Sequence, residues 1–437
     1  MLQGKNDQEL FALIDCNHFY VSCERAFRPE LEGFPVGILS NNDGCIVALS
    51  PELKALGVER GVPYFKIKHL LKRHKVTIFS SNYALYGDMS FRVMSLLSHF
   101  SPEIEVYSID EAFLSLAGLN ITDTDSFGEK IRNTIRQCTG IPISVGIAPT
   151  KTLCKVANKI AKKNDRRYVV PGKDKDGVFT IIDEKLRNHI LQHTPVADIW
   201  GIGYRYAKML KREGIFTAWD LTLKPDDWIR DKMTVVGLRT VEELRGKSCL
   251  SLEQVSEPKK GIVSSKSFGK IVESREEIRE AASSYCLNAV AKLRQQGSLA
   301  RRILVYLTTN PFKNEPQYAN YRELKLSGYS AYPPDFMKTA GRILDEIYRE
   351  GYRYKKVGVM LTDIIPEEEA PLDLFETSYP QDRRSQIMHC MDRINRKWGQ
   401  EAISFAGAGI KQGWQMRREM LSPRYTTCWG ELLKVKA

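Results

Sequence analysis

Long apolar runs are missing from this chain of 437 residues. No stretch approaches the ~20 consecutive apolar residues that a membrane-spanning helix needs, so we expect no transmembrane segment. Residues 1–10 are polar and lack the apolar core of a signal peptide. With 43% hydrophobic and 27% charged residues, the composition is that of an ordinary globular protein.

Clustered cysteines are missing as well. The nine cysteines are scattered and odd in number, and the sequence contains neither a C-x-x-C pair nor a Cys/His cluster. This pattern argues against both a zinc site and a disulfide framework. We therefore expect reduced thiols and a cytoplasmic protein.

Negative charge is in deficit. The chain carries 65 Lys and Arg against 53 Asp and Glu, a formal net charge of +12. A basic balance of this size favours a polyanionic partner, nucleic acid before anything else. A membrane surface is the competing explanation, and the lack of apolar runs disfavours it. The length allows two to four domains with proper cores.

What the chain does have is carboxylates at the polar ends of apolar, strand-like runs. Asp15 follows the run Phe11–Ile14, while Asp110 and Glu111 follow Val106–Ile109. Burying an acid is unfavourable unless something positive joins it. Three carboxylates on two adjacent strands are able to hold a pair of Mg²⁺ ions, which prefer oxygen ligands. Such a pair activates an attacking hydroxyl and stabilises a leaving pyrophosphate.

Two simpler explanations of these carboxylates stay open. A single Asp that closes a strand is commonly a turn or cap residue. An Asp-Glu pair inside an apolar run is also explained by an edge strand that faces water.

Residues 11 to about 196 mix short apolar runs with longer helical patterns, as an α+β domain requires. A helix is predicted between Phe127 and Gln137. Residues from about 28 to 80 have the pattern of an insertion. The predicted strands are Phe11–Ile14, Val36–Leu39, Val76–Phe79, Glu105–Ile109, Phe113–Leu116 and Ile143–Ile147.

An all-helical piece follows, roughly Thr194 to Leu252. Its centre, Trp200-Gly201-Ile202-Gly203, is typical of a helix-hairpin-helix. Two glycines let the backbone approach a phosphate, and the next helix N-terminus supplies N–H groups. The same Gly-apolar-Gly turn is also simply a tight connection between helices in many proteins.

From about Gly261 to Asp363 the periodicities alternate in a β-α-β-β-α-β order, a ferredoxin-like pattern. The acidic, proline-bounded stretch Pro366–Pro371 favours an extended linker. Beyond it, Trp398, Trp414 and Trp429 are expected to supply apolar bulk for a small folded tail.

Several motifs together resemble the Y-family (translesion) DNA polymerases, and most closely their UmuC subfamily. The resemblance spans nearly the whole chain. The matching stretches are Asp15-Cys16-Asn17-His18-Phe19-Tyr20, Ser40-Asn41-Asn42-Asp43-Gly44-Cys45, Phe79-Ser80-Ser81-Asn82-Tyr83, Tyr107-Ser108-Ile109-Asp110-Glu111-Ala112, Trp200-Gly201-Ile202-Gly203 and Leu421-Ser422-Pro423-Arg424-Tyr425-Thr426-Thr427.

This resemblance implies an α+β, multi-domain right-hand polymerase. A ferredoxin-like palm with small fingers is expected over residues 11–193, the fingers lying at about 28–80. A helix-hairpin-helix thumb is expected over 194–256 and a β-α-β-β-α-β little finger that binds DNA over 257–365. Residues 366–437 would form a linker and a UmuC-type C-terminal tail.

For the chemistry, the resemblance implies that Asp15 and Asp110 bridge two Mg²⁺ ions per active site. Glu111 would be a further ligand, and the backbone carbonyl of Cys16 would add an oxygen. Phosphoryl transfer asks a protein mainly for positioning and charge stabilisation, so no nucleophilic side chain is needed.

Tyr20 matches the steric-gate position of the family, with Phe19 beside it. A ring under the sugar leaves no room for a ribose 2′-hydroxyl. Without the motif, a buried core tyrosine is an equally good explanation. Lys54 and Lys162 match the basic residues that bind the triphosphate. Pro51 departs from the family, in which many members have a tyrosine there, and this puts that part of the phosphate site in question.

Positive charge recurs at intervals of three and four along one predicted helix. A solvated face is the ordinary explanation, and contact with template or triphosphate is the alternative that an adjoining active site favours. The residues are Lys151, Lys155, Lys159, Lys162, Lys163 and Arg166. In the later predicted sheet, Lys266, Lys270, Arg301 and Arg302 are candidates for phosphate contacts.

The stretch Pro371-Leu372-Asp373-Leu374-Phe375 resembles the short motif that binds the bacterial sliding clamp, with Pro371 in place of the usual Gln. Leu372, Leu374 and Phe375 are its apolar residues, which an exposed linker carries unfavourably unless a partner covers them. Anchoring of the linker on its own protein is the alternative. The resemblance also implies a processed UmuD-type dimer and RecA as partners.

The leading hypothesis is an error-prone, template-directed DNA polymerase that adds dNTPs to a primer 3′-OH in the SOS response. The resemblance also implies a bacterial protein that associates with the nucleoid when active. One rival is a catalytically idle DNA-binding or regulatory scaffold with the same fold, against which the intact carboxylates argue. A nucleotide cyclase with a similar palm is the other, although it needs neither the helix-hairpin-helix nor the second ferredoxin-like domain.

Overall fold

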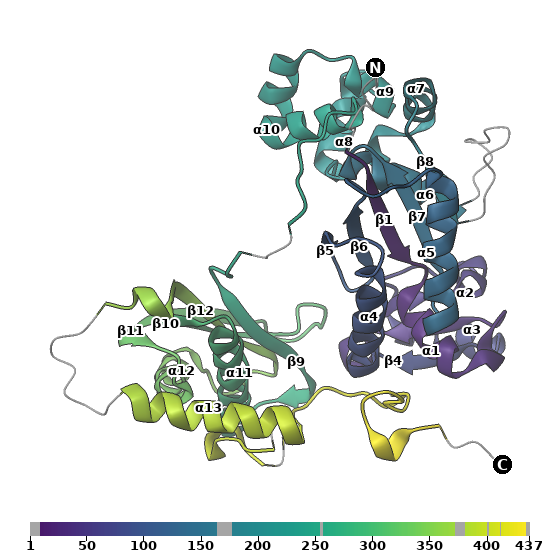
Figure 1. The fold of residues 1–437 in the computed structure, drawn as a ribbon. Coiled ribbons are helices and arrows are strands. Elements are labelled where there is room, and N and C mark those ends of the chain that lie inside the picture. Colours follow the sequence, from purple (N-terminus) through teal and green to yellow (C-terminus); the bar gives the residue numbers. More distant parts are fainter. Residues whose placement is uncertain are drawn as a thin grey trace. The chain divides into compact units, whose positions relative to one another are not determined.

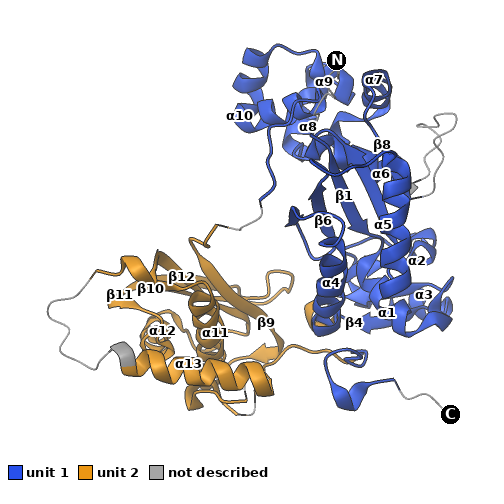
Figure 2. Cartoon of the chain, in the orientation of Figure 1, with its two compact units in different colours: residues 1–40, 44–256, 420–437 blue, residues 41–43, 257–419 orange. Residues whose placement is uncertain are grey.

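The computed structural model describes residues 9–163, 177–253, 257–371, 381–399, 402–410 and 412–433. The chain forms two compact units (Figure 2): residues 1–40, 44–256 and 420–437 make up the first, and residues 41–43 and 257–419 the second. In the part of the chain that the structure describes, no helix is both long and apolar enough to cross a membrane.

A five-stranded sheet organises the first unit (Figure 1). All its pairs are antiparallel except β7–β8. The order β5-β6-β1-β7 is that of a ferredoxin-like sheet, as predicted for the palm, and β8 extends it. The strands in order of pairing are β5 (Ile104–Val106), β6 (Glu111–Ser115), β1 (Phe11–Cys16), β7 (Ile143–Ala148) and β8 (Val178–Thr180).

Strand β1 is buried throughout and feeds two cores, because successive side chains of a strand point to opposite faces. Phe11 and Leu13 pack in the core that contains α6. Ala12 and Ile14 pack in the core that contains α1, α4 and α5. The helices are α1 (Phe19–Phe27), α4 (Tyr83–Leu97), α5 (Thr124–Thr139) and α6 (Lys151–Lys163). The helix predicted at residues 127–137 therefore lies within α5.

The predicted insertion has a sheet of its own with strand order β3-β2-β4. Pro51 occupies the first turn of α2, where a missing N–H leaves no hydrogen bond unmade. The Ser50 side chain caps the same helix by accepting from the Leu53 N–H at 3.2 Å. The elements are η1 (Pro29–Leu31), β2 (Val36–Leu39), η2 (Asn41–Asp43), β3 (Ile46–Leu49), α2 (Pro51–Ala55), α3 (Tyr64–Arg73) and β4 (Thr77–Ser80). Of these, η2 belongs to the second unit.

The helical piece after the sheet shares a core with it. Leu210 and Val241 are fully buried in the same cluster as Leu153 and Ala157 of α6. Residues 194–256 accordingly fall in the first unit together with the palm. The elements are α7 (Glu184–His193), η4 (Val196–Asp198), α8 (Tyr204–Arg212), α9 (Ala218–Thr222) and α10 (Asp226–Leu244).

The second unit confirms the predicted β-α-β-β-α-β order. Its elements are β9 (Ile262–Val272), α11 (Arg275–Gln295), β10 (Ser298–Thr309), β11 (Ala319–Ser330), α12 (Pro333–Ile347) and β12 (Tyr354–Pro366). The sheet order, however, is β11-β10-β12-β9. A ferredoxin-like sheet would place the first strand between the third and fourth, whereas the pairing described for β9 is with β12 alone. The ferredoxin-like expectation for this sheet was wrong because periodicity fixes the order of elements but not their pairing.

In the described part of the C-terminal segment, the three tryptophans do not form the separate folded unit that we expected. Only Trp414 is buried, at 3% exposure, and it packs against Phe268 and Tyr285 in the core of the second unit. Trp398 and Trp429 are 73% and 90% exposed. The remaining elements are η5 (Glu367–Glu369), α13 (Gln381–Trp398), η6 (Ala406–Ala408) and η7 (Trp429–Glu431).

Candidate active site

Strands β1 and β6 bring two of the predicted carboxylates together. Their antiparallel register pairs Asp15 with Glu111, and directly opposed residues share one face of a sheet. Asp15 has the parity of Phe11 and Leu13, so both carboxylates lie on the face that α6 covers. The sequence prediction that adjacent strands supply these two groups is confirmed.

The local structure before Asp110 differs from the prediction. Strand β5 ends at Val106, and the chain then turns, so the predicted strand Glu105–Ile109 was too long. The N–H groups of Tyr107 and Ser108 both donate to the carbonyl of Glu111 at 3.0 Å, which closes a hairpin. A short apolar run is compatible with either a strand or a hairpin turn. The carboxylates consequently sit at the start of β6.

Helix α6 places two lysines on the carboxylates. Lys162 Nζ lies 2.5 Å from Asp15 Oδ2, and Lys155 Nζ lies 2.7 Å from Glu111 Oε2. Residues seven apart lie on the same helix face, two turns from each other. Lys162 was predicted as a triphosphate ligand, and here its partner is Asp15. Lys155 had no individual role in the sequence analysis.

The Lys155 ammonium is also surrounded by aromatic rings. It lies 4.5 Å from the ring centre of Tyr107 and 5.6 Å from that of Trp200. A cation over ring faces is attracted by their negative π-density. Tyr107 and Trp200 themselves meet edge to face at 5.8 Å. The hairpin and the segment before α8 therefore fix the position of Lys155, and through it that of Glu111.

The two carboxyls have opposite pKa shifts. Burial, together with the hydrogen bond to Glu111, raises the pKa of Asp15 to about 7, against the opposing effect of Lys162. Burial also acts to raise the pKa of Glu111, but hydrogen bonds with Asp15 and Lys155 outweigh it and hold that pKa below its usual value. Two like charges this close are disfavoured without a compensating cation.

Asp110 is close to this pair but has its own partner. Its Oδ1 accepts from Ser108 Oγ at 2.6 Å, and its carbonyl accepts from the Cys16 N–H at 2.8 Å. Burial first, and then the charges of Asp15 and Asp110, raise the pKa of the Cys16 thiol. Among the described residues no group of three or more His, Cys, Asp or Glu side chains forms a ready metal cluster. The structure thus gathers Asp15 and Glu111, while Ser108 holds Asp110.

The donor chemistry of the pair fits a hard divalent cation. Carboxylate oxygens are the ligands that Mg²⁺ prefers, and Asp15 is 6% exposed, so its charge needs a partner. A bound cation would take over the neutralisation that Lys155 and Lys162 otherwise provide. Burial keeps the pKa of the Cys16 thiol above its usual range, and the expected contribution of this residue to such a site is its backbone carbonyl.

Tyr20 lies in a group of aromatic rings on α1 and α4. Its ring stacks on Tyr86 with centroids 4.4 Å apart and an interplanar angle of 14°, and it meets Tyr83 edge-on at 6.3 Å. Tyr20 is half-buried, whereas its neighbour Phe19 is 4% exposed and belongs to the core. Burial, Tyr83 and Asp110 raise the pKa of Tyr20. Asp110 is therefore close enough to Tyr20 for its charge to act on the phenol.

The other charges predicted on α6 are mostly paired with acids. The buried Lys151 contacts Glu105, and Lys159 lies 2.7 Å from Asp198. The charge run, for which a solvated face and a contact with template or triphosphate were both considered, is therefore largely paired with acids of the first unit. Arg166 lies outside the described residues. Lys54 is exposed on α2.

The Gly-Ile-Gly turn precedes helix α8, as expected. Gly201 has φ 87°, a conformation that favours glycine, and Gly203 is the N-cap of α8. The Ile202 side chain is 5% exposed and packs in the shared core. Any contact of this turn with a ligand therefore comes from the backbone. The element immediately before the turn is the 3₁₀ helix η4.

In the second unit, three of the predicted phosphate-binding side chains have protein partners. Lys270 lies 2.6 Å from Glu277, Arg302 lies 3.3 Å from Glu323, and Arg301 donates to the carbonyl of Ser327 at 3.2 Å. Lys266 lies on β9. The clamp-motif residues Leu372, Leu374 and Phe375 lie outside the described residues.

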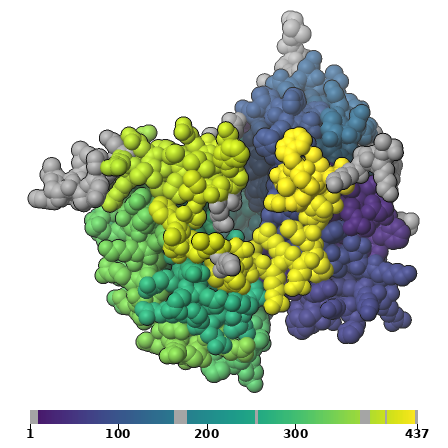
Figure 3. Space-filling model, turned by 90° about the horizontal axis from the view of Figure 1, so that it is seen from below, coloured from purple at the N-terminus to yellow at the C-terminus, as the bar shows by residue number. Residues whose placement is uncertain are grey.

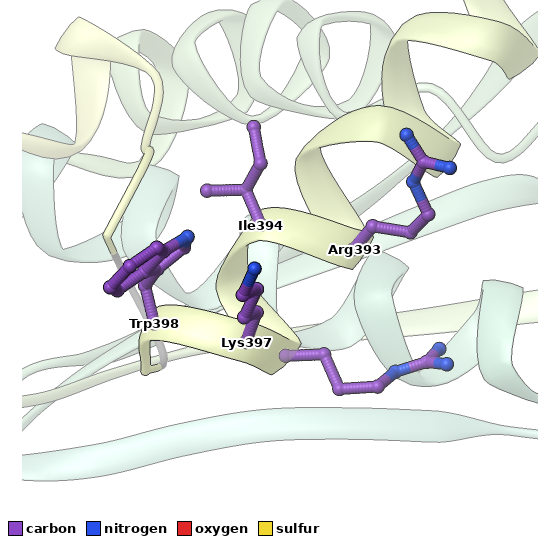
Figure 4. A pocket seen from close by; sticks show the side chains of 5 residues that line it. Arg393, Ile394, Lys397 and Trp398 are labelled. Carbon is purple, nitrogen blue, oxygen red and sulfur yellow. The ribbon is translucent and has the colours of Figure 1, made fainter.

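A hollow on α13 is unrelated to the carboxylates. It is lined by Arg393, Ile394, Arg396, Lys397 and Trp398, all from one helix (Figure 4). Lys397 Nζ lies 5.3 Å from the centre of the Trp398 ring. The helix belongs to the second unit and carries no acid at this hollow, so the hollow has none of the groups that nucleotidyl transfer needs.

Two residues close to Tyr20 were missed by the sequence analysis. Glu24 and Tyr86 are fully buried, and the Tyr86 hydroxyl donates to Glu24 Oε1 at 2.8 Å. Glu24 follows the apolar start of α1, four residues after Tyr20. An acid on the buried face of a helix was the available signal, because acids are rarely buried without a partner.

The family models match most of the chain. The model of the impB/mucB/samB family matches residues 14–159, and that of its C-terminal domain matches residues 259–374. A third model, described as a domain of unknown function, matches residues 385–435. The first match contains Asp15, Asp110 and Glu111.

Curated relatives match along nearly their whole length. Protein UmuC of Salmonella typhimurium is 46% identical over 429 residues, which cover 98% of this chain and 100% of that protein. Protein MucB of Escherichia coli is 40% identical over 425 residues, with coverages of 97% and 99%. DNA polymerase IV of Bacillus velezensis is 25% identical, with coverages of 91% and 92%.

Among solved structures, a Y-family DNA polymerase chimera of Dbh and Dpo4 aligns with a TM-score of 0.63 at 21% identity. It covers 82% of this chain and 99% of its own. An insertion ternary complex of Dbh DNA polymerase aligns with a TM-score of 0.53 at 22% identity. The chain has the fold of these enzymes and belongs to the impB/mucB/samB family, within which it is a UmuC-type member of the Y-family polymerases.

Proposed function

We propose that Asp15, Asp110 and Glu111 are the catalytic residues of this chain, an error-prone DNA-directed DNA polymerase for translesion synthesis in the SOS response. The observation that carries the proposal is the register of β1 and β6, which pairs Asp15 with Glu111. A catalytically idle scaffold has no need of two acids in contact on a buried face.

Family membership implies a divalent metal cofactor, and we propose two Mg²⁺ ions. Asp15, Asp110, Glu111 and the carbonyl of Cys16 would hold them. When bound, the ions activate the primer 3′-hydroxyl and stabilise the leaving pyrophosphate. The chain's own contribution is positioning: β1 and β6 fix the carboxylates, and Lys155, held by aromatic rings, neutralises Glu111 until a cation binds.

Sugar selection is proposed for Tyr20. Its stack on Tyr86 supports this role because the stack fixes the plane of the ring. A fixed ring excludes a 2′-hydroxyl by steric contact, the feature that separates ribonucleotides from deoxyribonucleotides. Phe19 supports Tyr20 from the core at a centroid distance of 5.9 Å.

For the triphosphate we propose Lys162 and Lys54. Lys162 is 35% exposed while it contacts Asp15, so its side chain lies at the surface and not in the core. Lys54 is exposed on α2. Pro51 stands where many family members have a tyrosine, and it begins helix α2. It has no hydroxyl to offer to the triphosphate.

DNA contacts are proposed for the backbone of Gly201, Ile202 and Gly203. Exposed N–H groups at the start of α8 and the basic residues that follow support this role. Those basic residues, Arg205, Lys208 and Arg212, are exposed. The little-finger sheet at residues 257–365 is proposed as a further DNA-binding surface.

We propose a processed UmuD-type dimer, RecA and the sliding clamp as partners. Leu372, Leu374 and Phe375 are the proposed clamp-binding residues, with Pro371 in place of Gln weakening the contact. These partner assignments rest on the sequence motif and on the family. Residues 366–370, which precede the motif, carry three acids and one proline.

Primer extension by the full chain tests this function. The assay uses an undamaged and an abasic template, with and without the processed UmuD-type dimer, RecA and the clamp. We expect Mg²⁺-dependent addition of dNTPs opposite both templates when the partners are present. A chain that binds primer–template but adds no nucleotide under any of these conditions would be the scaffold instead.

A further inference from the structure

Residues 420–433 belong to the first unit and pack against its N-terminal part. Ser80 N–H donates to the Met420 carbonyl at 2.8 Å, and Met420 N–H donates to Ser80 Oγ at 3.0 Å. Figure 3 shows the C-terminal residues in yellow against the N-terminal part of the chain in purple and blue. The contact is made at the end of β4, the strand that leads into α4.

Asn82, the N-cap residue of α4, holds the segment by its side chain. Its amide Nδ2 is 3.1 Å from the Ser422 carbonyl, 3.0 Å from Ser422 Oγ and 3.2 Å from the Pro423 carbonyl. Phe27 stacks on Tyr425 at 4.8 Å with an interplanar angle of 12°. These contacts specify one register of the tail on α1 and α4.

In that register, the tail reaches a buried carboxylate. Ser422 Oγ donates to Glu24 Oε1 at 2.9 Å, and the Tyr86 hydroxyl donates to the same oxygen at 2.8 Å. Ser422 is 4% exposed, and Glu24 and Tyr86 are fully buried. The other oxygen, Glu24 Oε2, has no hydrogen-bond partner among the described residues. Burial raises the pKa of Glu24, while the bonds from Tyr86 and Ser422 act against that rise.

Tyr86 also contacts Tyr20, because the two rings stack on each other. Tyr86 therefore has its hydroxyl fixed by Glu24 and its ring face against Tyr20, 4.4 Å between centroids. A buried acceptor that loses one of its few donors is strongly disfavoured. Without the Ser422 hydroxyl, Glu24 keeps only the hydrogen bond from Tyr86 among the two described for it. The carboxylate can then shift, and the Tyr86 hydroxyl shifts with it.

We propose that the segment Met420–Tyr425 is part of the sugar-selection machinery, with Ser422, Glu24 and Tyr86 as positioning residues for Tyr20. The inference rests on the proposed role of Tyr20 as steric gate. It adds that residues near the C-terminus help to position the Tyr20 ring. The tail thus has a role in nucleotide choice and not only in folding.

The test compares incorporation of single ribonucleotides and deoxyribonucleotides by the full chain, measured as separate kcat/KM values. Tyr86→Phe keeps the stacked ring and removes the anchor, and Ser422→Ala removes the tail hydroxyl. We expect each to raise the ribo-to-deoxyribonucleotide ratio about fivefold, the effect of losing one buried hydrogen bond. Ser422→Thr keeps a hydroxyl and should restore most of the selectivity.

The matched control is Glu431→Gln. It removes the charge of the Arg424–Glu431 pair, 2.6 Å apart within the same tail, and no contact among the described residues joins Glu431 to Glu24. We expect its ratio to equal that of the parent. Thermal unfolding of each variant separates a loosened fold from a changed gate, because a general loosening lowers dNTP incorporation as well as the melting temperature.

Tyr20→Ala distinguishes the two proposals. If Tyr20→Ala leaves the ratio unchanged, the gate itself is wrong and so is this inference. If Tyr20→Ala raises the ratio but Tyr86→Phe and Ser422→Ala both leave it at the parental value, the gate stands and the role of the tail is overturned.

Discussion

The carboxylate pair and the aromatic stack, the two parts of the proposed nucleotide site, are assembled in different ways. Asp15 and Glu111 come from neighbouring strands of one sheet, and their lysines come from one helix packed on it. The Tyr20 stack depends on Glu24, which accepts from Ser422, 398 residues away in the chain. The first part is held by strand pairing and helix packing, whereas the second, in our proposal, also depends on contacts from the C-terminal tail.

The difference has a physical consequence. A carboxylate that moves away from its cation loses charge compensation at once, so chemistry should fail sharply. A ring whose anchor is lost shifts within a packed cluster and still covers part of the same space. Damage to the first part should therefore abolish nucleotide addition, while damage to the second should change nucleotide choice.

The largest expected effect is that of Asp110→Ala. We expect nucleotide addition to fall roughly a thousandfold, since electrostatic stabilisation at the reacting phosphate is lost. Binding of primer–template should remain close to that of the parent, because the proposed DNA contacts lie on other elements. Primer extension and fluorescence anisotropy measure the two properties. Extension at the parental rate would remove Asp110 from the site.

Tyr20→Ala should alter selection instead of rate. Removing the ring opens space beside the 2′ position, and we expect the ribo-to-deoxyribonucleotide ratio to rise about 10- to 100-fold. Extension with each nucleotide type alone measures it. An unchanged ratio would return Tyr20 to the role of an ordinary core aromatic.

The clamp motif belongs neither to the carboxylate pair nor to the aromatic stack, so changing it should affect neither basal nucleotide addition nor nucleotide choice. Replacing both Leu374 and Phe375 by Ala should weaken clamp binding about tenfold, since few apolar anchors carry most of such an interaction. Clamp-stimulated synthesis should fall with it, while basal extension on a short primer stays unchanged. If the double variant binds the clamp as well as the parent does, the tether lies elsewhere.

The smallest expected effect concerns Lys155. Its ammonium competes with any cation for Glu111, so Lys155→Met should lower the Mg²⁺ concentration for half-maximal extension about threefold. Lys159→Met is the matched control, because Lys159 pairs with Asp198 and not with the proposed catalytic carboxylates. A higher Mg²⁺ requirement in the Lys155 variant would mean that Lys155 supports Glu111 in the metal-bound enzyme as well.

The sequence predicted the carboxylates because an acid inside an apolar run is conspicuous on its own. It could not predict the Glu24 network, since Tyr86 and Ser422 lie 62 and 398 residues from Glu24 and no local pattern links them. The lysines of α6 had the helical spacing that was predicted, yet their partners depend on how the helix packs.

The same limit applies to the second unit. Alternating periodicities gave its order of strands and helices correctly, because each element has its own repeat. The pairing of β9 with β12 was not predictable, since pairing depends on the packing of both helices against the sheet. Trp414 and Trp398 look alike in sequence, but Trp414 packs against the rings of Phe268 and Tyr285, whereas Trp398 is 73% exposed.

Metal binding tests the central claim most directly. Titration of the full chain with Mn²⁺ in the presence of primer–template and a non-hydrolysable dNTP, followed by electron paramagnetic resonance, counts the bound ions without requiring turnover. We predict two bound ions in the parent and loss of at least one in the Asp15→Asn, Glu111→Gln double variant. Equal Mn²⁺ binding by the parent and by this variant would contradict a metal site at Asp15 and Glu111.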